Sequence, residues 1–357
     1  MNIVRQRLAR QFLLDTAFRS GREVVRALGA VQSQDFAGAK WALSQRTIGA
    51  TDADIEREFS DGALIRTHVL RPTWHFVDPS DVRWMLALTA PRVKSAMASY
   101  NRKLELDAAV FRRSHAAIEK ALRDGQFRTR AELRTTLARA RVGIGSPQRM
   151  GHLMMEAELD GVACSGPRRG RLFTYALFDE RVPTSAPVDR DEALLRLTRC
   201  YFRTRGPATA HDFSWWSGLS MADVRRGIDV AGRELDAVTL GGRAHWLTGD
   251  VTPRRRAVAH LLPNYDEYFI GHRDRSAIGQ RLGSVQAVTG GNALIAHVVA
   301  VDGQLVGGWR LVREKASAVV RLQLLDRLSG PERRRVLTEV GRLARFLGEP
   351  VEVREPE

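Results

Sequence analysis

Residues 114–177 read SHAAIEKALRDGQFRTRAELRTTLARARVGIGSPQRMGHLMMEAELDGVACSGPRRGRLFTYAL, and this stretch decides the fold. Apolar residues recur at helical spacing at its start, and Thr129 with Glu132 forms a capping box that opens a second helix. A third helix is expected from Pro147 onward. Two short alternating runs, Val162–Cys164 and Leu172–Leu177, then flank a basic turn. Three helices followed by a hairpin with a cationic tip are typical of a winged helix.

The same plan recurs on both sides of this stretch. Toward the N-terminus, Thr51 caps a helix that precedes a hairpin over Leu64–Val77, and Glu23–Gln32 is expected to form an earlier helix. Toward the C-terminus, Ser220 opens a helix that precedes a hairpin around Gly241-Gly242. The copies share a pattern and no clear sequence repeat. We therefore expect three winged-helix modules, over residues 1–100, 101–182 and 188–250.

The remainder of the chain, residues 255–357, has a different pattern. Asn292–Ala300 and Gln304–Leu311 flank an Asp-Gly pair and predict a hairpin. Pro331–Leu347 carries one apolar stripe and predicts a closing helix. The expected fold class is thus mainly α with β-hairpins (α+β), ending in a β-rich unit.

Composition indicates a polyanionic partner. The net charge is +15 and the isoelectric point is about 10.8. An arginine-rich genome can raise the arginine content, but it does not explain the excess over 41 acidic residues. A membrane surface is also anionic, yet no amphipathic basic helix stands out, and no signal peptide or transmembrane segment is recognised. With only two cysteines, the chain fits a reducing compartment, and we expect a cytoplasmic, nucleoid-associated protein.

The first candidate site is the run Gln32-Ser33-Gln34, followed by Asp35. Residues two apart lie about 200° apart around a helix, so both glutamine side chains cannot share one helical face. They can converge only at a helix end or in an extended turn, which the following residues allow. The alternative interpretation is two solvated glutamines at a turn, with Asp35 capping the next helix.

The second candidate is the hairpin over Leu64–Val77. If Arg71-Pro72 forms its centre, His68 faces His75, and a polar face carries Arg66, His68, Thr73 and His75. Two histidines without a third ligand nearby do not predict a metal site. The open alternatives are a polar wing facing DNA and a semi-buried, satisfied histidine pair.

Two further motifs favour structural roles. Asp266 and Glu267 are adjacent and point apart in any regular structure, which argues against a paired-carboxylate site and for a packed loop. Trp215-Trp216 is expected in the core, with base stacking as the alternative. The scarcity of lysine, with none in a motif, argues against lyase chemistry through a Schiff base.

The order of several segments resembles the AlkZ-like winged-helix DNA glycosylases, a family that includes the YcaQ branch. The matching segments are residues 26–34, 71–77 with 84–88, 206–209 with 213–216, and 262–267 with 271–275. They span most of the chain. The resemblance implies three tandem winged helices plus a C-terminal β-barrel-like unit around a concave DNA-binding surface.

The resemblance also implies the site. In the family a Gln–aliphatic–Gln motif lies at the active centre, and the YcaQ branch has Asp in place of the second glutamine. Carried over, the catalytic residues are Gln32 and Gln34, with Ser33 departing from the aliphatic middle position. DNA contacts are expected from the hairpin and the second wing, at Arg66, His68, Arg71, Thr73, His75, Arg168, Arg169 and Arg171.

The implied activity is a monofunctional DNA glycosylase that removes cationic N3- or N7-alkylated purines, and interstrand crosslinks made through them. No cofactor or metal is expected, and the expected partner is double-stranded DNA carrying alkylated bases, bound by a monomer. The alternative is a winged-helix DNA-binding protein or transcriptional regulator without chemistry. Free-base release from alkylated DNA separates the two.

Overall fold

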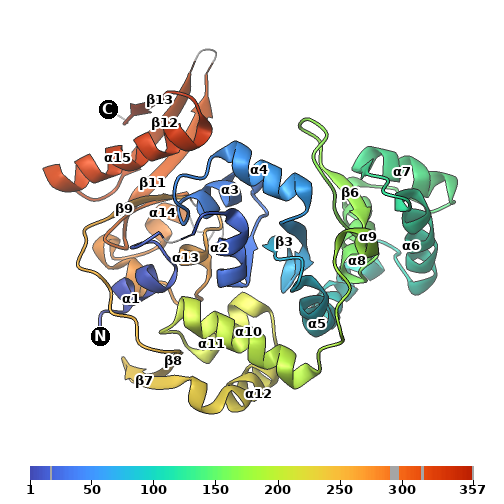
Figure 1. Cartoon of the computed structure of the whole chain (residues 1–357), viewed down its shortest axis with the longest axis horizontal. Helices are drawn as coiled ribbons and strands as arrows, with labels where there is room; N and C mark the ends of the chain where they lie inside the picture. The colour runs from blue at the N-terminus through green and yellow to red at the C-terminus, as the bar shows by residue number, and fades with distance from the viewer. Residues whose placement is uncertain (17, 290–296, 315–316, 356–357) are drawn as a thin grey trace.

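The computed structural model describes residues 1–16, 18–289, 297–314 and 317–355 (Figure 1). Helices and strands alternate along the chain, which is a mixed α and β structure. The first part comprises α1 (Ile3–Arg10), α2 (Gly21–Leu28), β1 (Ala30–Gln32), α3 (Phe36–Ser44), α4 (Asp52–Asp61), β2 (Ile65–Val69), β3 (Arg71–Val77) and α5 (Val82–Lys103). Its three strands form a sheet in the order β1-β3-β2.

The helix expected over Glu23–Gln32 is wrong in its last third. Helix α2 ends at Leu28, because Gly29 adopts φ +80°, a left-handed conformation that favours glycine. The chain then becomes strand β1, which pairs antiparallel with β3 in the register Ala30–Val77 to Gln32–His75. Tertiary pairing with a strand more than forty residues away in the chain overrides the local helical pattern.

The second part has the predicted order of three helices and a hairpin. It comprises α6 (Ala108–Leu122), β4 (Arg128–Thr129), α7 (Arg130–Arg139), α8 (Pro147–Leu159), β5 (Ala163–Ser165), β6 (Thr174–Leu177) and α9 (Phe178–Arg181). The predicted capping box is confirmed, since the Glu132 N–H donates to Thr129 Oγ1 at 3.2 Å and the Thr129 N–H donates back to Glu132 Oε2 at 2.6 Å.

The third part repeats this order with a hairpin of its own. It comprises α10 (Arg190–Arg205), α11 (Ala210–Ser217), α12 (Met221–Ala231), β7 (Asp236–Leu240) and β8 (Arg243–Leu247), with a 3-10 turn, η1 (Gly232–Glu234), before the hairpin. Ser220 caps α12 as expected, by accepting from the Asp223 N–H. The order of helices followed by a hairpin agrees with the prediction in all three parts, apart from the unexpected strand β1, while the winged-helix assignment and the module boundaries stay predictions.

The C-terminal part is built on an open sheet. It comprises β9 (Ala259–Leu262), α13 (Glu267–Ile270), η2 (Ser276–Ile278), η3 (Gln280–Leu282), α14 (Gln286–Thr289), β10 (Val298–Val301), β11 (Gln304–Arg313), β12 (Ala318–Leu324), α15 (Gly330–Leu347) and β13 (Val351–Arg354). The predicted strand at 292–300 is described only from residue 297, and residues 292–296 lie outside the described residues. The closing helix α15 packs on the sheet (Figure 1).

The expectation of a barrel-like unit is wrong for the described residues. The strand order is β13-β12-β11-β10-β9, so β9 and β13 form two separate edges. A barrel requires the first and last strands to pair. Within the part of the chain that the structure describes, β13 pairs only with β12, in parallel, after the chain returns through α15.

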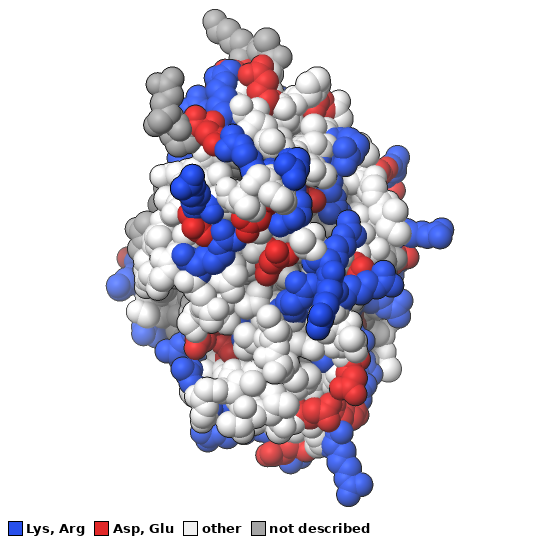
Figure 2. Space-filling view, turned by 90° about the vertical axis from the view of Figure 1, so that its left-hand side faces the viewer, with Lys and Arg blue, Asp and Glu red and all other residues white. Residues whose placement is uncertain are grey.

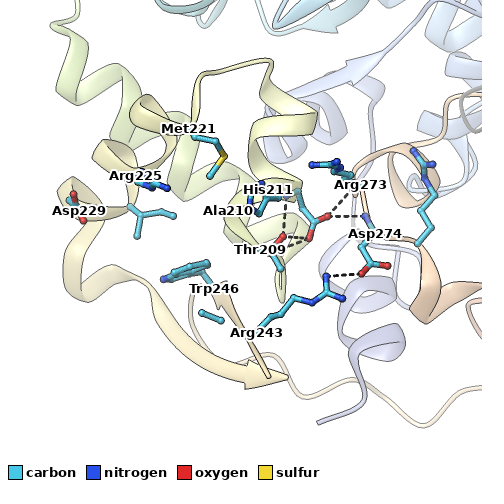
Figure 3. A pocket seen from close by; sticks show the side chains of 14 residues that line it. Thr209, Ala210, His211, Met221, Arg225, Asp229, Arg243, Trp246, Arg273 and Asp274 are labelled. Carbon is cyan, nitrogen blue, oxygen red and sulfur yellow. Dashed lines mark hydrogen bonds and ion pairs between the residues drawn. The ribbon is translucent and has the colours of Figure 1, made fainter. Parts of the chain in front are cut away.

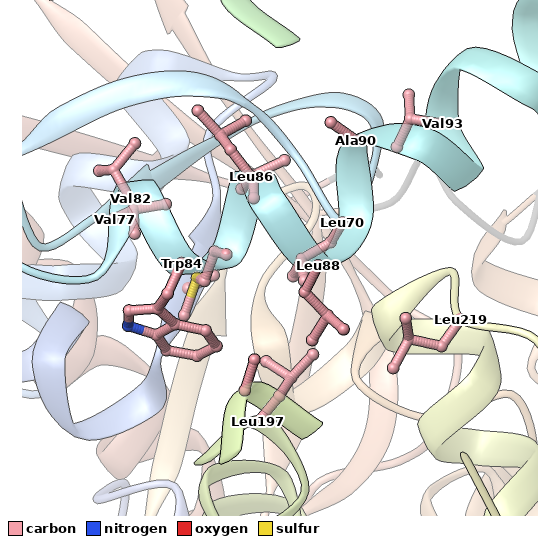
Figure 4. Packing of buried hydrophobic residues seen from close by; sticks show 14 of the residues in the cluster. Leu70, Val77, Val82, Trp84, Leu86, Leu88, Ala90, Val93, Leu197 and Leu219 are labelled. Carbon is pink, nitrogen blue, oxygen red and sulfur yellow. The ribbon is translucent and has the colours of Figure 1, made fainter. Parts of the chain in front are cut away.

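The three helical parts share one hydrophobic core. Figure 4 shows Trp84 and Leu88 of α5 facing Leu197 of α10, with Leu219, which precedes α12, in the same cluster. Met155 of α8 belongs to this cluster as well. Burial of such side chains contributes roughly 1.5–3 kcal/mol each. The shared core therefore holds the first hairpin, the middle hairpin and α11 in fixed positions relative to one another. Among the described residues no helix is both long and apolar enough to cross a bilayer.

Candidate active site and nucleic-acid interface

Gln32 is the last residue of β1, and tertiary contacts fix both its backbone and its side chain. Its N–H donates to Glu267 Oε1 at 2.9 Å, and its side-chain Oε1 accepts from Arg71 Nη2 at 2.8 Å. The residue is 5% exposed. Gln32 is therefore not one of the two solvated glutamines of the alternative interpretation.

Gln34 lies just beyond the strand and is exposed. The ladder continues through Ser33, whose N–H donates to the Trp74 carbonyl at 2.8 Å. Gln34 Oε1 then accepts from the Trp74 N–H at 3.4 Å, and Asp35 caps α3 as expected by accepting from the Gly38 N–H at 3.0 Å. The chain is thus extended where the motif lies. The amide oxygen of Gln32 accepts from the side chain of Arg71, and the amide oxygen of Gln34 accepts from the backbone of Trp74; both donors belong to β3.

The register of the first hairpin differs from the predicted one. Thr67 pairs with His75 and His68 pairs with Trp74, with a bulge after His68, so the predicted His68–His75 pair is wrong. The turn centres on Leu70, which adopts φ +63°, and not on Arg71-Pro72. A one-residue slip moves side chains to the opposite face of the strand, so the predicted single polar face is divided in two.

One face carries the first glutamine with the polar residues of β3. Gln32 and His75 are cross-strand partners, and cross-strand partners project to the same side of a sheet. Arg71 and Thr73 share this side with His75, because alternate residues of a strand point the same way. The structure therefore brings Gln32, Arg71, Thr73 and His75 together, and Gln34 lies at the end of the same strand pair.

His75 presents a hydrogen-bond acceptor on this face. Its Nδ1 donates to the Thr73 carbonyl at 2.9 Å, which leaves Nε2 as the atom without a proton. Complete burial, followed by the charge of Arg71, lowers the pKa of His75 well below its usual value. The ring is therefore neutral at physiological pH.

Several polar atoms around Gln32 are buried and, within the described part of the chain, have no hydrogen-bond partner. They are Arg71 Nε, Thr73 Oγ1 and His75 Nε2 on the face of Gln32, and Ser33 Oγ on the opposite face of the same strand pair. Orphaned buried polar groups are costly and are found where a site exchanges partners with water or a ligand. Their concentration beside the glutamines marks this place as the candidate site.

A buried ion pair between Glu267 and Arg205 binds the backbone of the candidate site. Glu267 Oε2 accepts from Arg205 Nη2 at 2.5 Å and from Trp216 Nε1 at 2.8 Å, while the other oxygen holds Gln32. Arg205 also donates to the carbonyls of Leu28 and Ala30, on either side of Gly29. Both charged side chains are at most 1% exposed. The pair thus fixes the end of α2 and all of β1.

The neighbouring carboxylate turns away, as expected for the packed loop. Asp266 accepts from Arg46 Nη1 at 2.8 Å and Nη2 at 2.9 Å, a bidentate contact that is also buried. Asp266 and Glu267 therefore bind different arginines. Trp216 is fully buried, which favours its core role, whereas Trp215 is partly exposed and donates from Nε1 to the Ile270 carbonyl at 3.1 Å.

Arg66 and His68 lie on the opposite face of the hairpin. Arg66 Nε donates to the Ser33 carbonyl at 3.1 Å, and its guanidinium lies over Trp74 at 4.3 Å. Burial lowers the pKa of Arg66 to about 10. His68 Nδ1 donates to Glu158 Oε2 at 2.7 Å. Their expected phosphate contacts stay a prediction, and their burial indicates that both also position the hairpin.

The middle hairpin is ordered against the first part by an arginine–aromatic stack. The guanidinium groups of Arg66 and Arg168 both lie over the ring of Phe173, at 4.8 Å and 4.2 Å from its centroid. Phe36, next to the glutamine motif, contacts Phe173 edge-on at 5.0 Å. The wing between β5 and β6 therefore stands beside α3 and α4 (Figure 1).

The tip of this wing is basic and exposed. Gly170 adopts φ +58° in the turn, and Arg169 and Arg171 flank it at the surface. Arg169 donates to Glu132 at 2.9 Å and to the Phe127 carbonyl at 3.0 Å. In the described structure the Arg171 side chain makes no hydrogen bond or ion pair, so its five donors are available to an anion.

Basic side chains also gather on the side of the molecule that carries α15 (Figure 2).

Sequence reasoning missed Arg205 as a support of the site and valued Glu267 only as part of a loop. Glu267 lies 235 residues from Gln32, so no local spacing connects them. The available signal was a pair of charges within the apolar run around Leu262 and Phe269, since buried charges require partners. Among the described residues no group of three or more His, Cys, Asp or Glu side chains could hold a metal ion.

Comparisons with known proteins agree with this architecture. The family model of DNA glycosylase AlkZ-like proteins matches residues 25–346. The chain is similar to a protein named interstrand DNA cross-link repair glycosylase, from Streptomyces sahachiroi, at 27% identity over 323 residues and 87% of each chain. It is also similar to the solved structure of Streptomyces sahachiroi DNA glycosylase AlkZ, with a TM-score of 0.83 and 25% identity over 99% of this chain and 98% of that one. The match covers the candidate glutamines, the first hairpin and the loop that holds Glu267, and the chain therefore belongs to the AlkZ-like DNA glycosylase family.

Proposed function

We propose that the chain hydrolyses the N-glycosidic bond of cationic alkylpurines in duplex DNA, with Gln32 and Gln34 as its catalytic residues. The observation that carries this proposal is the placement of both amide oxygens against one strand, amid orphaned buried polar atoms. Gln32 orients a water, and the carbonyl dipoles of the pair stabilise the positive charge that develops on the sugar.

The chemistry matches the residues available. An amide has no usable proton equilibrium near neutral pH, so neither glutamine acts as a general base. Such a site suffices only for a leaving group that departs readily. A purine alkylated at N3 or N7 carries a positive charge and leaves as a neutral base, so no acid is needed. Hydrolysis by water also makes the proposed enzyme monofunctional.

The substrate range is proposed to include interstrand crosslinks made through N7-alkylated purines. One relative carries cross-link repair in its name. We further assign α6–α8 with β5 and β6 to a winged helix whose wing contacts the DNA backbone through Arg168, Arg169 and Arg171. Arg71, Thr73 and His75 would face the lesion, while Arg66 and His68, which are buried on the opposite face, support the hairpin. A monomeric state and association with the nucleoid stay predictions.

The experiment that tests the proposal is a panel of duplexes, each with one defined alkyl lesion, assayed for free base and for abasic sites revealed by alkali. We expect release of 7-methylguanine and 3-methyladenine, and no release of unmodified purines. A protein that binds these duplexes and releases no base from any of them would instead be the non-enzymatic DNA-binding protein of the alternative interpretation.

The rate of base release should be independent of pH between about 6 and 8. Glutamine does not titrate, and His75, whose pKa is lowered, stays neutral throughout this range because it charges only below that lowered pKa. Arg66, with a pKa of about 10, stays charged. Single-turnover release of 7-methylguanine measures this profile. A step of tenfold per pH unit within the range would contradict the assignment.

Arg171→Gln should weaken duplex binding. It should also make the plot of the log association constant against log salt concentration less steep by about 0.9, the value for one lost phosphate contact. The physical reason is the exposure of this guanidinium at the wing tip. Fluorescence anisotropy over a salt series measures the slope. Arg327→Gln, at an exposed arginine of the C-terminal part, is the matched control and should leave the slope unchanged.

A further inference from the structure

The third part contains a cavity that the proposed reaction does not use. It has a volume of about 960 Å³ and opens between α11, α12, β8 and the segment after α13 (Figure 3). Helix α11 has 8 residues and is therefore about 12 Å long. The cavity is lined by residues at its start, whereas Gly218, which follows its end, contacts the Leu70 turn beside Arg71. The cavity and the glutamine site thus lie toward opposite ends of one helix.

Several cationic side chains line the cavity. Arg225 of α12 and Arg273 are exposed, and within the described residues neither guanidinium has a hydrogen bond or ion pair. Arg243 of β8 also lines it and pairs with Asp274 at 3.2 Å. Arg275 is 8% exposed, and its Nη2 is buried without a partner, while Nε donates to the Phe269 carbonyl at 2.7 Å. Unpaired arginine donors around a concavity favour a phosphate.

The acidic residues that line the cavity leave this charge largely unbalanced. Asp212 is saturated, because it accepts from the N–H groups of Thr209, Arg273 and Asp274 and from the Thr209 hydroxyl. Asp274 accepts from Arg243 and Ser276. Asp229 is the remaining carboxylate among the lining residues and is exposed.

The lining also contains apolar side chains. Met221 of α12 and Trp246 of β8 both line the cavity (Figure 3), and Ile228 and Ala244 are further lining residues. Trp246 packs against Phe202 at 6.1 Å, which fixes its orientation, and it remains partly exposed toward the cavity. A fixed, partly exposed indole is a stacking platform for a base.

We propose that this cavity binds an unpaired nucleotide of a DNA strand, with strand phosphates at Arg225 and Arg273 and its base against Trp246. A single nucleotide fits a concavity of this size, whereas a duplex does not. The proposal is independent of the chemistry at the glutamines, since it requires binding and no base release. It predicts that the protein holds a displaced nucleotide while the glutamine site acts elsewhere on the DNA.

Calorimetric titration of the full chain tests the proposal with 2′-deoxyadenosine 5′-monophosphate, deoxyadenosine, inorganic phosphate and a four-nucleotide single strand. We expect the nucleotide and the single strand to bind at the same site and more tightly than phosphate or the nucleoside. A double variant in which Arg225 and Arg273 are both replaced by Gln should bind the nucleotide and the single strand roughly tenfold or more weakly, because charge-assisted hydrogen bonds are lost. Both positions are exposed, so the fold should be unaffected.

Arg226→Gln is the matched control, because Arg226 is also exposed on α12 but binds Asp191 and does not line the cavity. It should leave nucleotide binding unchanged. The proposal is overturned if the double variant binds as the wild type does, if the nucleotide binds no better than phosphate, or if the free nucleotide binds and the single strand does not. Each readout is independent of base release, so it separates this proposal from the glycosylase reaction.

Discussion

Release of 7-methylguanine should fall about 10²–10³-fold when Gln32 is replaced by Ala, as expected for the loss of one preorganised electrostatic contact. Gln32→Ala with Gln34→Ala should reduce release to the uncatalysed rate. The reason is that both amides are proposed to act on the same water and sugar, and neither alone completes the arrangement. Single-turnover kinetics with a duplex that carries one lesion measures the loss, and duplex affinity should change little.

The control is Gln126→Ala, an exposed glutamine of the second part that lies outside the candidate site. It should release base at the wild-type rate. Thermal unfolding of each variant separates a catalytic loss from a loss of structure. If the double variant releases base as the wild type does, the glutamines are not the catalytic residues, and the orphaned polar atoms of β3 need another explanation.

Replacing Glu267 with Ala should lower the free energy of unfolding by about 3–5 kcal/mol, because it leaves Arg205 charged and buried without its partner. It also removes the acceptors of the Gln32 N–H and the Trp216 indole. Urea unfolding followed by tryptophan fluorescence measures the change. Because β1 loses its anchor, base release should fall as well, even at temperatures where the variant is folded.

Glu119→Ala is the matched control for this prediction. Glu119 of α6 and Arg123, which follows this helix, form an exposed ion pair, and such pairs contribute little to stability. Glu267→Gln keeps the shape of the side chain and removes its charge. Its loss of unfolding free energy should be intermediate between those of Glu267→Ala and Glu119→Ala. A loss of stability from Glu267→Ala no larger than that from Glu119→Ala would show that the buried pair does not hold the site.

Much of the local structure follows from short-range sequence signals. The capping boxes at Thr51 and Thr129 act over three residues, and both are formed as predicted. The turn glycines Gly241-Gly242 lie where the β7–β8 hairpin was expected. Helices with an apolar stripe, such as α15, were also predictable, because apolar residues recur in the sequence at the spacing of one helical face.

The first hairpin and the glutamine segment were less predictable. The sequence contains no signal that Leu70 adopts a left-handed conformation, and this single residue sets the register that separates His68 from His75. Likewise, the apolar pattern before Gln32 predicts a helix, and only pairing with β3 in the folded chain makes residues 30–32 a strand. The open sheet, in place of a barrel, also depends on which strands meet.

The amino-acid sequence alone determined the order of helices and hairpins and the basic character of the chain, which depend on interactions within a few residues or on composition. The resemblance to the family singled out the two candidate glutamines. Only the tertiary structure decided how the glutamines lie, because Gln32 is held by a strand some forty residues away and by a carboxylate 235 residues away. Contacts at such separations arise from packing of the whole chain, which no local spacing encodes.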